Sequence, residues 1–283
     1  MKLGVVFPQT EIGTDPDDIA RFATRTEALG YDHLIAYDHV LGAGTATRPD
    51  WRGPYTAESP FFEPLVLFSY LAALTRRIEL VTAVIILPQR QTALVAKQAA
   101  CLDVLSRGRL RLGIGIGWNP VEYEALGENF HDRGERSEEQ IDLLRRLWAE
   151  ETITFEGQWH RVTDAGINPL PPRRRIPLWL GGMAPQVQER VGRIGDGWFP
   201  FANPDLAEQI RTVHEHAHRA GRDPGEIGIE CFVPHTADAP QLRRLQEAGV
   251  THLAVVTMNA KLAGAQAHAD AITRFREVLS TAF

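Results

Sequence analysis

The chain has 283 residues, 44% hydrophobic side chains, a formal net charge of −6 and no basic block, so it has room for one large core and no general attraction for nucleic acid. Its two cysteines, Cys101 and Cys231, are too few for a disulfide framework and lack metal-ligand spacing, which predicts a cytoplasmic protein without a bound metal. The longest apolar run, residues 80–87, is too short to cross a bilayer, and no signal-peptide pattern opens the sequence, so we expect no membrane association.

Strand and helix patterns alternate along the whole chain, as short apolar runs followed by segments with helical spacing of apolar side chains. The expected strands cover residues 3–7, 33–36, 78–86, 109–115, 176–180, 197–199, 227–233 and 252–257. The expected helices cover residues 15–29, 63–74, 92–105, 135–149, 185–194, 204–220, 240–248 and 265–279. Eight such pairs predict an α/β fold, a single (β/α)8 TIM barrel over residues 1–283, although an open doubly wound sheet would share much of the pattern.

Two insertions interrupt the alternation. Residues 42–60, after the second strand, are rich in Gly and Pro and carry Trp51 and Tyr55, so they predict a long ordered loop that is a candidate lid. Residues 151–164, before the fifth strand, alternate apolar and polar side chains around Glu156 and Gly157, which predicts a small hairpin.

In a parallel barrel the functional face lies at the carboxyl ends of the strands. Asp38 and His39 follow the second strand and pair a carboxylate with the side chain best suited to proton transfer, although a satisfied loop pair or helix cap is the alternative. Thr82, Ala83 and Val84 end the third strand, and on their residue types alone they are core.

The fourth strand carries Gly113, Gly115 and Gly117 at a two-residue period, so the three glycines share one face of the strand. A dinucleotide-binding turn is excluded because Trp118 stands where G-x-G-x-x-G needs its third glycine. A face without side chains leaves space inside the barrel for a planar ring beside Trp118, whereas simple relief of crowding is the alternative.

The fifth strand runs into Gly181, Gly182 and Met183, and Ala184 then precedes a helix that begins at Pro185. Alanine cannot cap the free amide groups with its side chain. Exposed N–H groups and the helix dipole both favour an anion, which predicts a phosphate cradle, with water-capped amides as the alternative.

Two further motifs resemble a zinc site and a phosphate-binding site, but their positions in the predicted fold do not fit such sites. His214 and His218 match the zinc-protease pattern H-E-x-x-H, but the apolar stripe of their helix places them away from the core, and no third ligand is evident. The three arginines at 173–175 precede the fifth strand and so belong to the opposite end of the barrel from the site, as surface charge.

Taken together these segments resemble the luciferase-like monooxygenase superfamily, and especially its branch of oxidoreductases that use the deazaflavin coenzyme F420. The resemblance covers nearly the whole chain. It is carried by YDHV at 37–40, the segment 87–118 from LPQRQTALVAK to GIGIGW, EGQWHRV at 156–162 and PLWLGGMAP at 177–185.

The resemblance implies a flavin-like ring across the barrel mouth, with a non-proline cis peptide bond between Ala83 and Val84 behind it. It implies that Gly181, Gly182 and Met183 bind the cofactor phosphate. The residues expected to contact the cofactor are Thr82, Ala83, Val84, Ile116, Gly117, Trp118, Gly181, Gly182 and Met183.

By the same resemblance, Asp38 orients the ring and His39 exchanges a proton while a hydride moves at the ring. Some relatives carry a glutamate acid after the fourth strand, where this chain has Trp118, which puts their sugar-phosphate chemistry in doubt here. We expect Glu122 to form an ion pair with Arg133 or Arg136 that braces the loop, with a catalytic role as the alternative.

The expected function is therefore hydride transfer between coenzyme F420 and a small organic substrate. A reduced-FMN-dependent monooxygenase and a non-catalytic flavin-binding barrel are the alternatives, because the phosphate cradle serves either cofactor. The resemblance also implies a homodimer through helices near the second and third strands, and the substrate is not identified by the sequence.

Overall fold

In the computed structural model, which describes residues 1–282, eight parallel strands close into a barrel. They are β1 (Lys2–Val6), β2 (His33–Ala36), β3 (Glu79–Thr82), β5 (Leu110–Gly115), β8 (Leu178–Gly181), β9 (Gly197–Phe199), β10 (Gly228–Pro234) and β11 (His252–Val256). β3 pairs with β5 as well as with β2, and this pairing closes the described part of the sheet into a barrel. The predicted TIM barrel is confirmed, and an open sheet is excluded.

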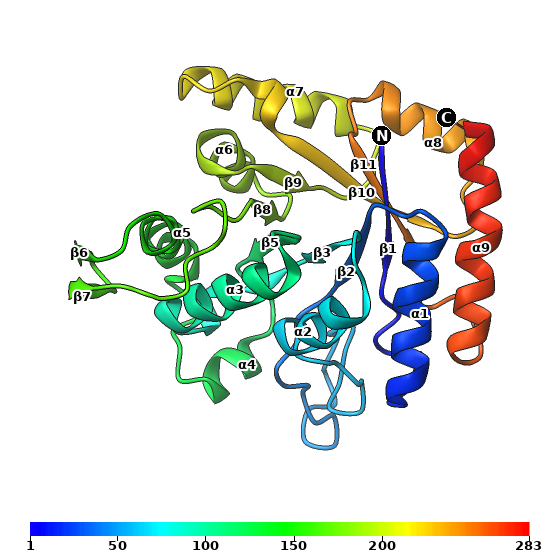
Figure 1. Cartoon of the computed structure of the whole chain (residues 1–283), viewed down its shortest axis with the longest axis horizontal. Helices are drawn as coiled ribbons and strands as arrows, with labels where there is room; N and C mark the ends of the chain where they lie inside the picture. The colour runs from blue at the N-terminus through cyan, green and yellow to red at the C-terminus, as the bar shows by residue number, and fades with distance from the viewer. Residues whose placement is uncertain (283) are drawn as a thin grey trace.

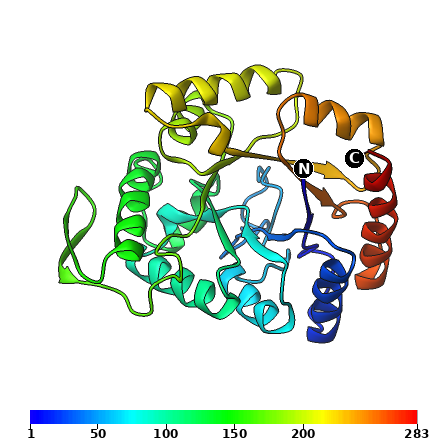
Figure 2. The same cartoon turned by 45° about the horizontal axis from the view of Figure 1, so that its top comes forward.

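Helices form a ring around these strands (Figure 2). They are α1 (Pro16–Ala28), α2 (Pro64–Leu74), α3 (Thr92–Ser106), α4 (Pro120–Ala125), α5 (Arg133–Ala149), α6 (Pro185–Ile194), α7 (Leu206–Arg219), α8 (Ala239–Glu247) and α9 (Gly264–Ala282), with short 3₁₀ turns η1 (Leu87–Gln89) and η2 (Pro224–Glu226). No helix within the described residues is both long and apolar enough to cross a membrane.

Strand alternation divides the core in two. Leu34 and Ala36 of β2 point outward and pack with the surrounding helices, whereas Ile35 points inward and packs with Val81 and Phe199 inside the barrel. The outer layer is the larger one and buries the apolar stripes of the helices. α1, for example, is capped by Asp15, whose carboxylate accepts from the Asp17 N–H at 2.9 Å.

The amino-terminal end of the barrel is filled by a buried charged cluster and an indole. Glu230 accepts hydrogen bonds from His33 and from Arg111 Nη1, the latter at 2.7 Å. The Arg111 guanidinium also lies 4.2 Å from the centre of the Trp179 ring. A Cβ atom on Gly197 would lie 2.2 Å from Trp179, so this glycine makes room for the indole. The barrel is therefore closed at this end.

The carboxyl ends of the strands lie at the bottom of Figure 1, where the loop 42–60 (light blue) and α4 also lie. The expected hairpin before the fifth barrel strand is confirmed as β6 (Ile153–Glu156) paired antiparallel with β7 (Arg161–Ala165). It stands out from the ring of helices in Figure 2. The helix α4, which the sequence pattern did not predict, fills the connection between β5 and α5.

The third predicted strand, residues 78–86, is broken in the structure. β3 ends at Thr82, and a separate short strand, β4 (Ile85–Ile86), continues along β5 with Ile85 opposite Ile114. The peptide bond between Ala83 and Val84 is cis, as the resemblance implies. The chain therefore bulges at the mouth, between the two pieces of the strand.

Candidate active site

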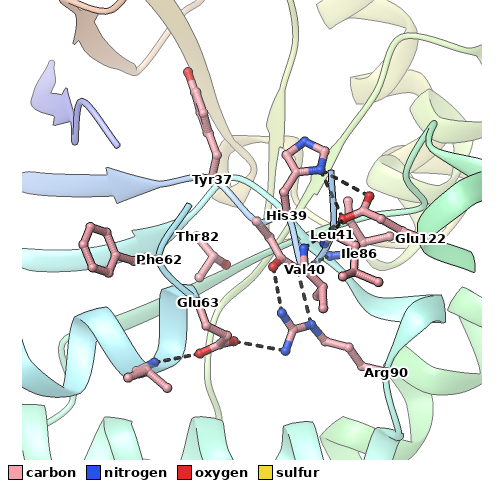
Figure 3. Close-up of polar contacts among 12 residues, drawn as sticks. Tyr37, His39, Val40, Leu41, Phe62, Glu63, Thr82, Ile86, Arg90 and Glu122 are labelled. Atoms are coloured by element: carbon pink, nitrogen blue, oxygen red, sulfur yellow. Dashed lines mark hydrogen bonds and ion pairs between the residues drawn. The ribbon is translucent and has the colours of Figure 1, made fainter. Parts of the chain in front are cut away.

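Three consecutive side chains follow β2 at the mouth. Tyr37 and His39 point to the same side of the chain, whereas Arg90 and Glu63 lie on the opposite side, where α2 begins (Figure 3). The alternation of an extended chain explains this arrangement and turns Asp38 toward Arg90.

The Asp38 carboxylate is held by hydrogen bonds from other residues of the protein. Its Oδ2 accepts from the Ile86 N–H at 3.0 Å, and its Oδ1 accepts from Arg90 Nη2 at 2.7 Å. Arg90 Nη1 in turn lies 3.0 Å from Glu63 Oε1, and the other Glu63 oxygen accepts from the Val66 N–H at 2.8 Å and caps α2. These contacts fix the corner between β2, β4 and α2. A direct contact of Asp38 with a bound ring stays a prediction.

His39 is supported by a buried carboxylate. Glu122, 1% exposed and on α4, lies with Oε2 3.2 Å and Oε1 3.3 Å from His39 Nδ1. Glu122 Oε1 also accepts from the backbone N–H groups of Val40 at 2.8 Å and Leu41 at 3.2 Å. Burial opposes ionisation, but His39 and these two amides outweigh it and lower the pKa of Glu122.

An ionised Glu122 favours the His39 tautomer with hydrogen on Nδ1, which leaves the lone pair on Nε2. Among residues 1–282, no atom hydrogen-bonds Nε2 of His39. The arrangement is that of a general base or acid whose ring is oriented by a carboxylate.

The predicted ion pair of Glu122 with Arg133 or Arg136 is wrong. Arg136 pairs with Glu128 instead, and Arg133 donates to the Phe130 carbonyl at 2.5 Å and lies over the Phe130 ring. α4 turns the Glu122 side chain toward β2, away from both arginines.

Aromatic side chains surround His39. The ring centres of Tyr55 and Phe61 both lie 4.9 Å from that of His39, and the centre of Trp118 lies 5.7 Å away. Trp51 packs on Trp118, so the loop 42–60 is ordered and closes over one side of the imidazole. Trp118 itself is 41% exposed at the rim of the mouth.

The glycine face of β5 does not form an empty space for a ring, and this part of the prediction is wrong. A Cβ on Gly113 would lie 1.9 Å from the Thr82 carbonyl oxygen, and one on Gly115 would lie 2.4 Å from Val84 Cγ2. Gly117, at φ +68°, faces Ile86 at 2.7 Å. The glycines accommodate the bulge between β3 and β4.

The bulge forms a wall at the mouth. Val84 lies against glycine positions on β5 and on the next strand, β8, since a Cβ on Gly181 would lie 2.9 Å from its Cγ1. Ala83 and Val84 are half-buried and pack with the inner core. Thr82 is fully buried, and its hydroxyl donates to the Gly113 carbonyl at 2.9 Å, so it fixes the bulge to β5.

In the turn after β8, no atom of residues 1–282 accepts from the backbone N–H groups of Gly182, Met183 and Gln186. Ala184 is the N-cap of α6 and makes no side-chain capping bond. Gly182 has φ +128°, a conformation that favours glycine, and its carbonyl accepts from Trp198 Nε1 at 2.8 Å. The residues from Gly181 to Met183 are half-buried beside the Val84 wall. This geometry fits a phosphate group at the start of α6.

The zinc-like pattern on α7 faces outward. Leu206, Ile210, Val213 and Ala217 form the buried stripe of α7, whereas His218 is exposed and Glu215 pairs with Arg219 at 3.1 Å. Within the described chain, no group of three His, Cys, Asp or Glu side chains is placed to hold a metal ion.

The family model described as luciferase-like monooxygenase matches residues 1–280. The chain belongs to this family. A curated relative of this luciferase-like protein, an uncharacterized protein of Mycobacterium tuberculosis, is 32% identical over 259 residues and 88% of each chain is covered.

Two relatives of the luciferase-like protein have named activities. An FMNH2-dependent dimethylsulfone monooxygenase of Pseudomonas fluorescens is 30% identical, over 81% of this chain and 61% of that one. An F420-dependent glucose-6-phosphate dehydrogenase of Kineococcus radiotolerans is 31% identical, over 75% of this chain and 61% of that one. A solved F420-dependent secondary alcohol dehydrogenase has the same fold, with a TM-score of 0.80 at 18% identity over 100% of this chain and 99% of that one.

The luciferase-like protein is thus an enzyme of an oxidoreductase and monooxygenase superfamily whose members use F420 or FMN. The structure brings His39, Val84 and Trp118 to one mouth. No local sequence pattern indicates Tyr37 or Arg90 as part of this mouth, and Glu122 pairs with His39 and not with the predicted arginines. One sequence signal could have indicated α4: Asn119, a typical helix-capping residue, stands directly before Pro120, where the helix begins.

Proposed function

We propose that this luciferase-like protein transfers a hydride between coenzyme F420 and a small organic substrate. The observation that carries the proposal is the His39–Glu122 pair at the barrel mouth, with Nε2 of His39 free to exchange a proton. Oxidation of an alcohol carbon removes a hydride from carbon and a proton from oxygen, so the site must supply a proton acceptor beside the hydride acceptor.

The mouth offers features that fit the cofactor. The free amides at Gly182, Met183 and the start of α6 suit a phosphate, and the Ala83–Val84 wall is half-buried and apolar, as a flat ring requires. The residues proposed to contact the cofactor are Ala83, Val84, Ile116, Gly117, Trp118, Gly181, Gly182 and Met183. Thr82, which is fully buried, would act only through the bulge that it fixes. When bound, the deazaflavin supplies a carbon that accepts or releases a hydride.

The protein side chains divide the remaining work. His39 Nε2 takes the proton from a substrate hydroxyl, or returns it in the reverse direction, while Glu122 holds the imidazole in position. Asp38, Arg90 and Glu63 keep the β2 corner rigid beneath it. Tyr55 and Phe61 cover the ring and limit access of water to it.

A reduced-FMN-dependent monooxygenase is the second candidate. The Pseudomonas fluorescens relative favours it, and an uncapped α6 suits the FMN phosphate equally well. The Kineococcus radiotolerans relative favours F420, and so does the His39 imidazole held by the Glu122 carboxylate.

Titration of the purified protein with each oxidised cofactor, followed by fluorescence, separates the two. We expect saturable F420 binding in the micromolar range, about −8 kcal/mol, and FMN binding at least tenfold weaker. Tight FMN binding without F420 binding would reject the proposal in favour of the monooxygenase.

We also propose a homodimer in the cytoplasm. Large apolar side chains are exposed on two helices that pack together, Val66 and Tyr70 on α2 and Leu94 and Leu105 on α3, with Val66 69% exposed. Analytical ultracentrifugation of the wild type and Val66→Glu tests this, since a monomer in both would reject it. Free thiols at Cys101 and Cys231 are consistent with a reducing compartment.

A further inference from the structure

The hydroxyl of Tyr37 takes no part in the proposed proton transfer by His39 or in the hydride transfer. Gln9 fixes the main chain of Tyr37 on both sides: its Oε1 accepts from the Tyr37 N–H at 2.5 Å, and its Nε2 donates to the Tyr37 carbonyl at 3.1 Å. The side chain points to the same side as His39 (Figure 3). Within residues 1–282, no atom hydrogen-bonds the Tyr37 hydroxyl.

The surroundings of the Tyr37 ring are apolar. It packs with the inner core that includes Ile35 and Met258, and it meets the Phe232 ring edge to face at 6.2 Å. Burial, with smaller effects of Tyr55 and Glu230, raises the pKa of Tyr37, so the hydroxyl keeps its proton. This hydroxyl is therefore a donor that a ligand oxygen can accept from.

A hollow of about 500 Å³ lies beside Phe232, at the carboxyl ends of β10 and β11. Phe232, Val256 and Met258 form its apolar part, and His235 and Asn259 its polar part. Its lining contains no Asp, Glu, Lys or Arg side chain among the described residues. A volume of this size holds a small organic molecule, and this lining suits one without charge.

The arginine nearest the β2 corner is not available to an anionic substrate. Arg90 is paired with both Asp38 and Glu63, and its side chain is 14% exposed. A phosphate or carboxylate on the substrate would therefore meet a mouth without a free arginine at this corner, next to the ionised Glu122.

We propose that the hollow beside Phe232 is the substrate side of the mouth, and that the Tyr37 hydroxyl donates a hydrogen bond to the carbonyl or hydroxyl oxygen of an uncharged, largely apolar substrate. The inference rests on the proposed function. When a ketone is reduced, the hydride adds to carbon and a proton from His39 adds to oxygen, while Tyr37 keeps its own proton. Tyr37 is thus a positioning residue that aims the substrate oxygen.

The test uses cyclohexanone as a probe, with the F420-loaded protein and the variant Tyr37→Phe, which removes only the hydroxyl. Tyr70→Phe is the matched control, because the Tyr70 hydroxyl donates to the Pro16 carbonyl at 3.2 Å on the outer surface. We expect the dissociation constant of cyclohexanone to rise about tenfold in Tyr37→Phe alone. The infrared C=O stretch of bound cyclohexanone should lie at lower frequency in the wild type than in Tyr37→Phe.

A second variant probes the hollow without touching Tyr37. His235→Glu places a carboxylate in its lining and should weaken cyclohexanone binding at least tenfold, with F420 binding within twofold of the wild type. Cyclohexanecarboxylate should not bind the wild type.

Equal affinity and equal C=O frequency in the wild type and Tyr37→Phe would overturn the inference. So would the absence of saturable cyclohexanone binding, or tighter binding of cyclohexanecarboxylate. In each of these cases intact F420 binding leaves the proposed function standing, whereas failure of the wild type to bind F420 rejects that function itself.

Discussion

Glu122 lies 3.2 Å from the Nδ1 atom of His39, although 83 positions of sequence separate the two residues. α4 brings them together. Asn119 caps this helix through the Val121 N–H at 3.1 Å, and its side-chain amide donates to the Leu41 carbonyl at 3.4 Å, which ties α4 to the chain after β2. The carboxylate is therefore positioned before any ligand arrives, as general acid–base catalysis requires.

Removing the charge of Glu122 should slow turnover. In Glu122→Gln the amide keeps the shape of the side chain but no longer favours the His39 tautomer with hydrogen on Nδ1, so we expect kcat to fall about 10- to 100-fold. Steady-state kinetics measures this. Glu124→Gln, an exposed glutamate on the same helix, is the control and should match the wild type. Equal rates in both variants would show that Glu122 only braces the loop.

Replacing His39 should separate catalysis from cofactor binding. His39→Ala removes the proton acceptor while leaving the Val84 wall and the start of α6 in place, so F420 affinity should stay within about twofold and turnover should fall about 10²- to 10⁴-fold. Fluorescence titration and stopped-flow hydride transfer give the two quantities. Unchanged turnover would favour a barrel that only carries a flavin.

A side chain at Gly115 should displace the wall. The added Cβ of Gly115→Ala would lie 2.4 Å from Val84 Cγ2, so we expect a loss of about 1–3 kcal/mol in the free energy of unfolding and weaker F420 binding. Gly44→Ala is the control, because nothing lies within 4 Å of its added Cβ. Denaturant unfolding and cofactor titration of both variants measure the effects. An unaffected F420 affinity in a destabilised Gly115→Ala would place the ring away from Val84.

A carboxylate at the start of α6 should stabilise the protein and weaken cofactor binding. In Ala184→Asp the new side chain caps free amides, a gain of about 1 kcal/mol, and repels a phosphate at the same place. We expect a higher melting temperature and at least tenfold weaker F420 binding. Ala184→Asn caps without charge and should weaken binding less. If Ala184→Asp binds F420 normally, the phosphate lies elsewhere.

Acid should weaken the barrel through Glu230. Burial opposes the ionisation of Glu230, but His33 and Arg111 outweigh it and lower its pKa from the usual 4.5 to about 2. A lowered pKa means that the ionised form stabilises the fold above pH 4.5. This stability, about 3 kcal/mol, is lost as the pH falls through 2.

Urea unfolding between about pH 7 and pH 2 should show this loss in the wild type. Glu230→Gln should be less stable at neutral pH by about 3–5 kcal/mol, because Arg111 is left without its buried partner. Its stability should also depend less on pH below 4.5. Parallel curves for the two proteins would assign the acid sensitivity to other groups.

The sequence predicted the barrel because its signals are local. Each strand–helix pair carries its own alternation, and capping residues such as Asp15 mark where helices begin. The cis peptide bond at Ala83 and the broken strand are different: periodicity alone makes residues 78–86 one strand, and only the family resemblance indicated the cis bond. That resemblance rested on residues far from the bond as well as near it.

The details of the site depend on contacts that no local pattern records. Strand periodicity places Gly113 and Gly115 on one face, but it does not reveal that Thr82 and Val84 of the neighbouring strand occupy that face. The partner of Glu122 was likewise misassigned, because α4 has six residues and is too short to show which way its side chains turn. Both errors concern which distant residue fills a given space.

The charged cluster around Glu230 and the indole of Trp179 fill the amino-terminal end of the barrel. A coenzyme and a substrate would therefore both approach the barrel from the mouth, at the carboxyl ends of the strands.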